Sequence, residues 1–189
     1  MKPMAIIFAR APRLGTVKRR LARDIGDRAA LRFHHQTLTR LARDMVADRT
    51  FATVIAVTPD RARLRLMPAS FGQGTGNLGT RMARACAKFP RCNVVLLGCD
   101  IPAANAADVR DALRRLGTAD ALFGPAEDGG YWLVAMGPRR PARPFRNVRW
   151  SGPHALADTL RNFAGHRVGF IRRLSDVDDA ADYQRLVRP

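Results

Sequence analysis

The stretch Asn93-Val-Val-Leu-Leu-Gly-Cys-Asp-Ile-Pro102 joins an apolar segment to a carboxylate. Its four consecutive aliphatic residues, 94–97, predict a strand that is buried on both faces, as in a parallel sheet. Asp100 then follows the carboxyl end of that strand, which is where open α/β sheets bind their ligands. A second acidic segment, Ala126-Glu-Asp-Gly-Gly-Tyr131, follows the apolar residues 121–123. Two acidic strand ends in an arginine-rich chain indicate a divalent metal that holds a phosphorylated ligand.

The rest of the chain alternates between strand-like and helix-like segments. This alternation predicts a three-layer α/β/α fold, with a mostly parallel sheet covered by helices on both faces. The tight Gly129-Gly130 turn predicts one local antiparallel strand. Residues 61–70 fit either a short helix or a strand. The predicted strands are 4–9, 51–58, 94–97, 120–123, 131–136 and 168–172, and the predicted helices are 18–23, 27–47, 78–89, 104–116, 153–163 and 178–186.

Length and composition narrow the class of protein. With 189 residues, the chain is long enough for one domain with a full core, so residues 1–189 are predicted to form a single domain. No apolar run approaches the roughly 18 to 20 residues of a membrane span, and residues 4–9 are too short for a signal peptide. The three cysteines are odd in number and lack Cys-x-x-Cys spacing, so they indicate neither a disulfide framework nor a zinc site. A cytoplasmic protein without a membrane partner is therefore predicted.

The chain carries a net charge of +17, from 33 basic and 16 acidic residues. A charge of this size fits an anionic partner such as a nucleotide or a phosphate. The arginines, however, are scattered through every segment and form no stripe with interleaved aromatic residues, which argues against a nucleic-acid partner. A general preference for arginine explains most of the charge. Lys18 is an exception to this preference for arginine. It lies in a glycine-containing loop, where a lysine offers a compact point charge.

Two loops have the composition of a nucleotide site. Arg10-Ala-Pro-Arg-Leu-Gly-Thr-Val-Lys-Arg-Arg20 follows the first strand and enters a helix, where backbone amides and cations bind phosphate well. Gly72-Gln-Gly-Thr-Gly-Asn-Leu-Gly-Thr-Arg-Met82 contains glycines that allow a ligand to approach the backbone closely. Neither loop has the Walker A or Gly-x-Gly-x-x-Gly spacing, so solvated surface loops are the alternative. The candidate nucleotide-binding residues in these loops include Ala11, Pro12, Arg20 and Arg81.

Asp100 and Asp128 are the candidate metal ligands. Mg²⁺ and Mn²⁺ prefer oxygen ligands and commonly bridge carboxylates and phosphates. The alternatives are a capping or turn role for Asp100 and a turn role for Asp128, with Glu127 as a bystander. The carboxylates of 176–179 are predicted to cap the last helix in preference to binding metal. Two further residues, His34 and Cys99, are predicted to be packed without a chemical role.

Several segments carry a resemblance to a known family. These are Phe8-Ala-Arg-Ala-Pro-Arg-Leu-Gly-Thr-Val-Lys18, Gln73-Gly-Thr-Gly-Asn-Leu-Gly-Thr-Arg-Met82, Leu97-Gly-Cys-Asp-Ile-Pro102 and Gly124-Pro-Ala-Glu-Asp-Gly-Gly-Tyr-Trp132, with Trp150-Ser151 and Asp176-Val-Asp178. In this order they resemble a bacterial glycosyltransferase-A-like family of the nucleotide-diphospho-sugar transferase superfamily. That family is similar to the molybdenum cofactor and 2-phospholactate guanylyltransferases, and some of its members are assigned to arsenosugar biosynthesis. The resemblance covers nearly the whole chain.

The resemblance implies roles for particular residues. Asp100 matches the family's metal-binding aspartate, and Asp128 matches the aspartate of its Asp-Gly-Gly motif. Gly15 and Lys18 match the phosphate-contacting loop, while Gln73 and Gly74 match the loop that faces the nucleotide. The chain departs from the pattern by having Arg10, Arg19 and Asn77 where the family usually has Lys, Thr and Asp, and Cys99 where Ser or Thr is common.

These features predict a metal-dependent transferase that acts on a nucleotide-activated substrate and an unidentified small-molecule acceptor. Asp100, Asp128 and Lys18 are its expected catalytic residues, because such reactions depend on positioning and charge neutralisation. A glycosyltransferase would release a nucleoside diphosphate from a nucleotide sugar, and the family resemblance favours it. A nucleotidyltransferase would release pyrophosphate from a nucleoside triphosphate, and the Gly-x-x-Lys loop fits that reaction. A nucleotide-binding protein without turnover is the third interpretation.

Overall fold

The computed structural model describes residues 1–62, 64 and 69–187. The sequence fitted either a helix or a strand at 61–70. Most of the central part of this segment lies outside the described residues. Among the described helices, none is both long and apolar enough to cross a membrane. The strands are β1 (Met4–Arg10), β2 (Ala52–Thr58), β3 (Ser70–Gly72), β4 (Val94–Gly98), β5 (Ala121–Pro125), β6 (Tyr131–Met136) and β7 (Val168–Phe170). The helices are α1 (Arg19–Ile25), α2 (Asp27–Ala47), α3 (Leu78–Ala87), α4 (Ala106–Arg115), α5 (Ala155–Arg161) and α6 (Ala180–Val187).

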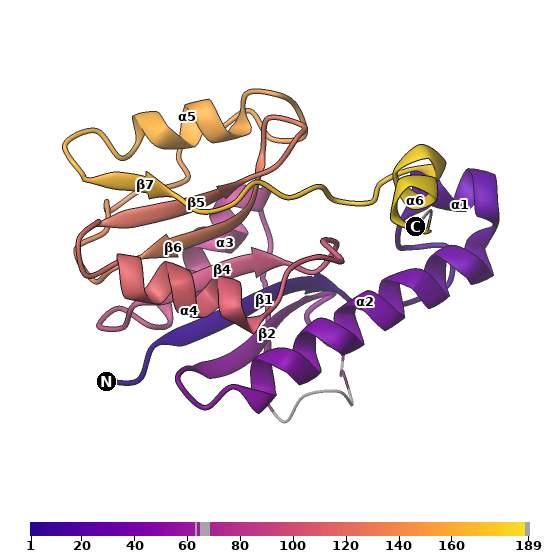
Figure 1. The fold of residues 1–189 in the computed structure, drawn as a ribbon, viewed down its shortest axis with the longest axis horizontal. Coiled ribbons are helices and arrows are strands. Elements are labelled where there is room, and N and C mark those ends of the chain that lie inside the picture. The colour runs from indigo at the N-terminus through magenta and orange to yellow at the C-terminus, as the bar shows by residue number, and fades with distance from the viewer. Residues whose placement is uncertain (63, 65–68, 188–189) are drawn as a thin grey trace.

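The seven strands form one sheet in the order β3-β2-β1-β4-β6-β5-β7 (Figure 1). Strand β6 is antiparallel to both of its neighbours, and the other pairs are parallel, which confirms the mostly parallel sheet with a local antiparallel strand. The strand β3 was not predicted as such, since the sequence indicated a loop from Gly72 onward and a helix or a strand for 61–70. Three residues are too few to show a period of two, and β3 forms at the edge because β2 supplies its hydrogen-bonding partner.

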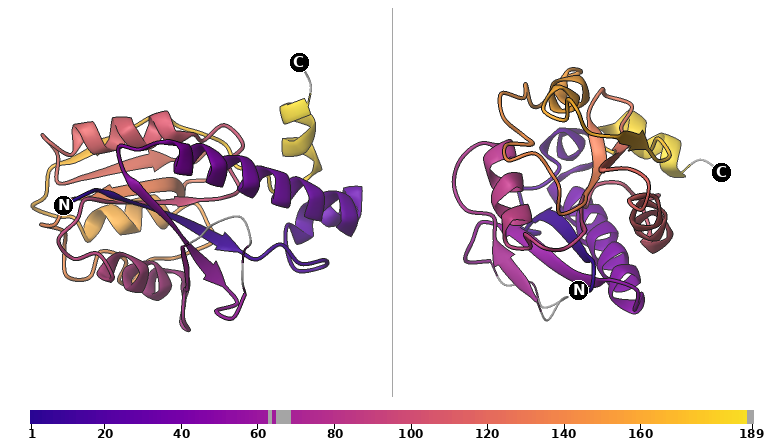
Figure 2. Two further views of the ribbon diagram at one scale, coloured as in Figure 1. Left: turned by 90° about the horizontal axis from the view of Figure 1, so that it is seen from below. Right: turned by 90° about the vertical axis from the view of Figure 1, so that its left-hand side faces the viewer.

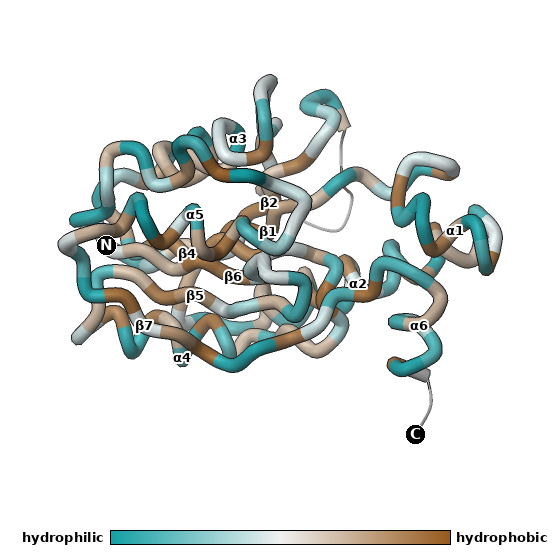
Figure 3. The backbone as a smooth tube through the Cα atoms, turned by 90° about the horizontal axis from the view of Figure 1, so that it is seen from above, coloured by the Kyte–Doolittle hydropathy of each residue, from teal (hydrophilic) through white to brown (hydrophobic). Residues whose placement is uncertain are grey.

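Helices cover both faces of the sheet, which gives the three predicted layers (Figure 2). Successive residues of a strand point to opposite faces. In β1, Ile7 packs in the cluster that includes residues of α2 and α4, whereas Ile6 packs with residues of α3 and the segment after α5. Both side chains are fully buried. Hydrophobic residues accordingly run along the central strands in Figure 3.

Two helices lie away from the sheet, beyond the carboxyl end of β1 (Figures 1 and 2). Helices α1 and α6 pack there against the first half of α2, around the buried side chains of Leu21, Ala30 and Val177. The rings of Phe33 in α2 and Tyr183 in α6 meet edge to face, with centroids 5.4 Å apart. We call α1, α6 and the first half of α2 the helical extension. Residues 171–179, here the C-terminal strap, connect it to β7 at the far edge of the sheet.

Helix α2 has the predicted bounds, 27–47. Gly26 is its N-cap, with φ +83°, and Asp27 is the first helical residue. No side chain caps this end of the helix. The Asp27 carboxylate still lies in the first turn, where a negative charge interacts favourably with the helix dipole.

Candidate functional site

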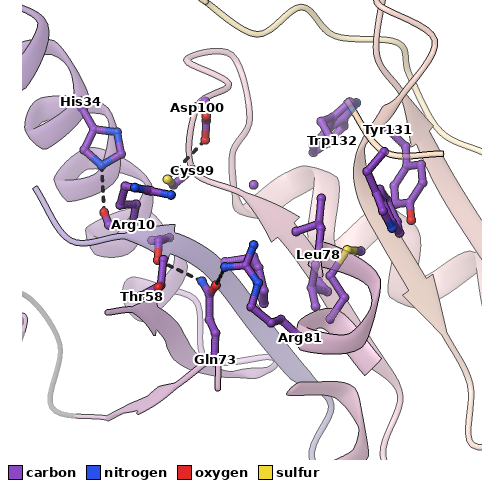
Figure 4. Close-up of a pocket in the computed structure, with 16 residues that line it drawn as sticks. Arg10, His34, Thr58, Gln73, Leu78, Arg81, Cys99, Asp100, Tyr131 and Trp132 are labelled. Carbon is purple, nitrogen blue, oxygen red and sulfur yellow. Dashed lines mark hydrogen bonds between the residues drawn. The ribbon is translucent and has the colours of Figure 1, made fainter. Parts of the chain in front are cut away.

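The topology places a crevice at the carboxyl ends of β1 and β4. These strands are parallel neighbours, but the chain continues from β1 toward β2 on one side and from β4 toward β5 and β6 on the other. Open α/β sheets bind ligands at such switch points. A cavity of about 290 Å³ lies here, and we call it the β1–β4 cavity. Figure 4 shows side chains from several elements around it, among them Arg10, Gln73, Arg81, Asp100, Tyr131 and Trp132.

A second cavity of about 220 Å³ adjoins the first. Three carboxylates line it, those of Asp100, Asp128 and Asp176, and we call it the acidic cavity. The two cavities share Asp100 and the aromatic residues Tyr131 and Trp150 in their linings. The predicted metal ligands therefore meet at one cavity, and Asp100 lies at the boundary between the two.

Lys18 is held against Asp100 by the local backbone. It adopts a left-handed conformation, with φ +46° and ψ +49°, immediately before α1. Its ammonium lies 3.0 Å from Oδ2 of Asp100 and 2.8 Å from Oδ1 of Asp178, and only 5% of its side chain is exposed. Burial disfavours this charge, but the carboxylates of Asp100 and then Asp178 outweigh burial and raise the pKa of Lys18. The lysine is therefore a fixed positive charge beside Asp100, although it lines neither cavity itself.

Asp100, just after the end of β4, is contacted by two donors, the Lys18 ammonium and the Cys99 thiol. Burial works to raise its pKa, but the Lys18 ammonium and the thiol of Cys99 lower the pKa of Asp100 below its ordinary value. The Cys99 Sγ donates to Oδ1 of Asp100 at 3.3 Å. Burial, followed by the charge of Asp100, raises the pKa of the Cys99 thiol well above its usual range. Cys99 thus remains a protonated, packed donor that orients Asp100.

Asp128 performs the turn role that the sequence allowed and also lines the acidic cavity. Its Oδ1 accepts a hydrogen bond from the Gly130 amide at 2.8 Å. Gly129, at φ +84°, packs so tightly that a Cβ there would lie 2.6 Å from Cα of Pro153. The turn is also bound to α5, since the Leu156 amide donates to the Gly129 carbonyl at 3.1 Å. Glu127 is exposed and lines neither cavity.

The prediction for 176–179 was wrong in part. Asp179 does cap α6, because its Oδ1 accepts from the Asp182 amide at 3.0 Å. Asp178 instead pairs with Lys18, and Asp176 lines the acidic cavity. Burial and then the charges of Asp178 and Asp128 raise the pKa of Asp176 to about 6. The sequence did carry a signal for this arrangement. Asp176 and Asp178 are two residues apart, and alternate residues of an extended segment lie on the same side.

Gln73 and Arg81 lie together in the β1–β4 cavity. The buried Gln73 amide donates to the carbonyls of Ala9 and Ala56, at 3.0 and 2.9 Å, and its Oε1 accepts from Arg81 at 2.8 Å. The Arg81 guanidinium lies 5.9 Å from the ring centroid of Phe8. Burial, followed by the charge of Arg10, lowers the pKa of Arg81. Because its amide is engaged by the sheet, Gln73 positions Arg81 for a ligand.

The other predicted nucleotide-binding residues line neither cavity. Ala11 is buried, and its amide donates to the Thr58 carbonyl of β2 at 2.8 Å. Gly15 has φ +71° and faces open space, while Pro12 faces a separate hollow along α2. The amide of Gly74 donates to Asp60 at 2.9 Å. Arg20 is exposed, with its guanidinium 3.8 Å from the Asp178 carboxylate.

His34 is a further cavity residue that was not predicted from sequence. His34 is packed, as expected for its position in a long helix, but its ring also lines the β1–β4 cavity. Its Nε2 lies 3.0 Å from the Arg10 carbonyl (Figure 4). Burial lowers the pKa of His34, so the ring is neutral at physiological pH. Helical periodicity alone cannot distinguish a core histidine from one that packs beneath a binding loop.

The donor set fits a divalent cation that is shared with a phosphorylated ligand. Asp100 and Asp128 offer carboxylate oxygens on one cavity wall. Within residues 1–62, 64 and 69–187, no group of three or more His, Cys, Asp or Glu side chains is arranged to hold a metal by itself. Mg²⁺ commonly binds through one or two carboxylates plus waters and substrate phosphates, so two carboxylates suffice for such a site.

The sequence of residues 37–152 matches the family described as "Uncharacterized protein conserved in bacteria (DUF2064)". The chain belongs to this family. No protein of curated function matches it significantly in sequence. A candidate nucleotide-diphospho-sugar transferase from Desulfovibrio desulfuricans G20 has 28% sequence identity and a TM-score of 0.92, with 100% of this chain and 87% of that chain covered.

More distant structures share the fold. A 4-diphosphocytidyl-2C-methyl-D-erythritol synthase is 13% identical, with a TM-score of 0.61 and coverage of 98% of this chain and 96% of that chain. The Rv0371c protein of Mycobacterium tuberculosis H37Rv, in complex with manganese, is 16% identical, with a TM-score of 0.56 and coverage of 99% and 98%. The chain therefore has the fold of the nucleotide-diphospho-sugar transferase superfamily, as its sequence predicted, and it is a transferase of that superfamily.

Proposed function

We propose that this protein is a metal-dependent glycosyltransferase that uses a nucleotide sugar. The observation that carries the proposal is the position of Asp100, which lies between two adjoining cavities with the buried Lys18 ammonium 3.0 Å away. A nucleotide sugar has the same order of parts, namely a nucleoside, a charged diphosphate and a sugar. The match to a candidate nucleotide-diphospho-sugar transferase over the whole chain supports the same class of substrate.

The nucleoside would occupy the β1–β4 cavity. Arg81, which Gln73 holds by a 2.8 Å hydrogen bond, offers donors to a base or a ribose there, and Tyr131 and Trp150 provide an apolar wall. The diphosphate would then lie near Lys18. A phosphate oxygen can replace the Asp178 carboxylate at this ammonium, since both are anionic acceptors. Because the ammonium is already in place, this exchange of one anionic partner for another is enough for it to stabilise the leaving diphosphate.

Asp100 and Asp128 would hold a Mg²⁺ or Mn²⁺ ion at the acidic cavity. When bound, such an ion supplies Lewis-acid neutralisation of the phosphate oxygens. The manganese complex of the fold neighbour from Mycobacterium tuberculosis supports this choice of ion. Cys99 would act as a positioning residue, because its thiol donates to Asp100 at 3.3 Å.

Nucleotidyl transfer is the second candidate. Lys18 follows β1 and would meet the β- and γ-phosphates of a triphosphate equally well. A CMP:2-keto-3-deoxy-manno-octonic acid synthetase, 12% identical with a TM-score of 0.59, is a fold neighbour complexed with CTP. The two reactions differ in their products, which are a nucleoside diphosphate for glycosyl transfer and pyrophosphate for nucleotidyl transfer.

A thermal-shift titration tests both candidates. The protein is titrated with Mn²⁺ and a panel of nucleoside triphosphates and nucleotide sugars, and the ligand that stabilises it is assayed for release of diphosphate or pyrophosphate. We expect Mn²⁺-dependent stabilisation by a nucleotide sugar. No stabilisation by any nucleotide contradicts both candidates.

The variant Asp100→Asn then tests the metal assignment. We expect it to lose Mn²⁺-dependent turnover, whereas Asp111→Asn, which makes the same charge change on the exposed face of α4, keeps it. Unchanged turnover in Asp100→Asn would show that this carboxylate holds no metal.

A further inference from the structure

We propose that the acidic cavity accepts the transferred sugar only when that sugar is uncharged or carries an amine. The substrate would then be a nucleotide linked to a neutral or amino sugar, and not to a uronic acid or a phosphorylated sugar. This inference rests on the proposed function, because it assigns the acidic cavity to the group beyond the diphosphate.

The charge of the lining carries the inference. The chain has 33 basic residues and a net charge of +17, so an average surface of this protein is positive. The described lining of the acidic cavity nevertheless contains the three carboxylates of Asp100, Asp128 and Asp176 and no lysine or arginine. The cavity therefore has the opposite sign to the rest of the molecule. A negatively charged sugar would be repelled from it.

The nearby positive charges do not cancel this sign. Lys18 is shared between Asp100 and Asp178, and it lines neither cavity. A divalent ion between Asp100 and Asp128 would be shared with the two phosphates of the substrate. Asp176 remains. The basic side chains of Arg173 and Arg185 line a separate hollow together with Asp176, but neither is in the described lining of the acidic cavity. Its half-buried position strengthens repulsion, because charges interact more strongly away from bulk water.

The remaining surface of the cavity suits a hydroxyl-rich ring. The half-buried Trp150 stands beside Tyr131, with ring centroids 6.2 Å apart, and both line the cavity. Aromatic faces pack against the apolar C–H face of a sugar, and ionised carboxylates accept hydrogen bonds from its hydroxyls or amine. A volume of about 220 Å³ is below that of drug-sized sites and suits a single small group.

Matched pairs of nucleotide sugars test the charge preference. UDP-glucose and UDP-glucuronate differ only at C6, as do GDP-mannose and GDP-mannuronate. Their dissociation constants are measured by calorimetry with Mn²⁺ at pH 8, beside UDP and GDP alone. We expect the neutral member of the pair with the accepted base to bind about tenfold or more tightly than the uronate. Equal affinity, or a preference for the uronate, would overturn the inference.

The variant Asp176→Asn identifies the source of the preference. We expect it to reduce the ratio between neutral and uronate sugars at least threefold, with a much smaller change in the affinity for the nucleoside diphosphate alone. Asp111→Asn, which removes the same charge from α4, should leave the ratio unchanged. An unchanged ratio in Asp176→Asn contradicts the inference. Absence of binding by every nucleoside diphosphate, UDP and GDP included, in the parent protein would instead contradict the proposed function, so the two failures are distinguishable.

Discussion

At the scale of single residues, Lys18 has the most constrained position in the candidate site. Its backbone is left-handed without being glycine, a conformation that costs roughly 1–2 kcal/mol for an ordinary residue. Residues in such conformations cluster at functional sites, where the surrounding structure holds them in place. Here the two carboxylates of Asp100 and Asp178 hold the ammonium. The strain and the buried charge are consistent with a preformed phosphate site.

We predict that Lys18→Met weakens nucleotide binding about tenfold to a hundredfold. A charge-assisted hydrogen bond contributes about 1.5–3 kcal/mol, and the variant also leaves Asp100 and Asp178 to repel the phosphates. Calorimetric titration of the variant with the preferred nucleotide and Mn²⁺ measures the change.

The control for this prediction is Lys88→Met. Lys88 is exposed and its ammonium lies 5.0 Å from the ring centroid of Phe71, away from both cavities. The variant Lys88→Met removes the same charge as Lys18→Met, and we expect its affinity for the nucleotide to stay within about twofold of that of the parent protein. If both variants lose affinity equally, the effect comes from net charge and Lys18 has no specific role.

At the scale of elements, two loops outside the central strands shape the acidic cavity. One is the β5–β6 turn, which carries Asp128, and the other is the segment before α5, which carries Trp150. The turn is packed against that segment at Gly129 and Pro153. Changes at either contact should therefore alter the cavity without disturbing the sheet core.

We predict that Gly129→Ala destabilises the protein more than Gly165→Ala does. Both glycines have positive φ values, +84° and +81°. A Cβ at 165 would meet nothing within 4 Å, so that variant costs only the backbone strain of about 1–2 kcal/mol. A Cβ at 129 would in addition collide with the Pro153 backbone. Urea unfolding of both variants gives the comparison, and equal losses would show that the turn moves freely.

The segment before α5 is held by an ion pair. The Arg149 side chain donates to Asp158 through two nitrogens, at 2.8 and 3.0 Å, and Arg161 donates to the same carboxylate at 2.8 Å. The hydrogen bonds from Arg149 are the largest cause that lowers the pKa of Asp158. Because the folded pKa is depressed, the carboxylate stabilises the fold above its unfolded value of about 3.9.

We predict that this contribution is lost as the pH falls from about 5 toward the lower folded-state pKa. At pH 7, Asp158→Asn should unfold at a lower urea concentration than the parent protein, and the gap should narrow at pH 3. A gap that stays constant with pH would show that the ion pair contributes only through packing.

At the scale of the whole molecule, the helical extension stands apart from the sheet yet carries two charges of the site. Lys18 precedes α1, and Asp178 precedes α6. The extension has its own small cluster of buried side chains, separate from the two clusters on the faces of the sheet. Local opening of this unit would therefore separate Lys18 from Asp178 while the sheet stays folded.

We predict that Tyr183→Ala loosens α1 and α6 and leaves the sheet unchanged. Removing the ring ends its edge-to-face contact with Phe33, which is worth about 0.5–1.5 kcal/mol beyond burial. Amide exchange in α1 and α6 should accelerate about twofold to tenfold, while β1, β4 and β6 keep their protection. Hydrogen-exchange mass spectrometry measures both regions, and Tyr183→Phe, which keeps the ring, should match the parent. Uniform acceleration over the sheet would contradict an independent unit.

Sequence pattern was sufficient for the layers of the fold and for the order of its long elements. The apolar run 94–97 and the alternation of strands and helices depend on local periodicity, which the chain carries wherever it folds. The antiparallel β6 followed from the short Gly129-Gly130 turn. The choice of Asp100 as a site residue followed from the rule that ligands bind at the carboxyl ends of strands. In the structure, Asp100 and Asp128 line the same cavity.

Only the tertiary structure showed what surrounds those carboxylates. The C-terminal strap starts from β7 at the far edge of the sheet and continues past the carboxyl ends of β5 and β4 (Figure 1). Asp176 thereby reaches the acidic cavity, and Asp178 reaches Lys18, 160 residues earlier in the chain. His34 likewise lines the β1–β4 cavity because α2 passes beneath the Arg10 loop. Periodicity and turn chemistry report the state of each segment, whereas contacts between distant segments depend on how all the layers pack.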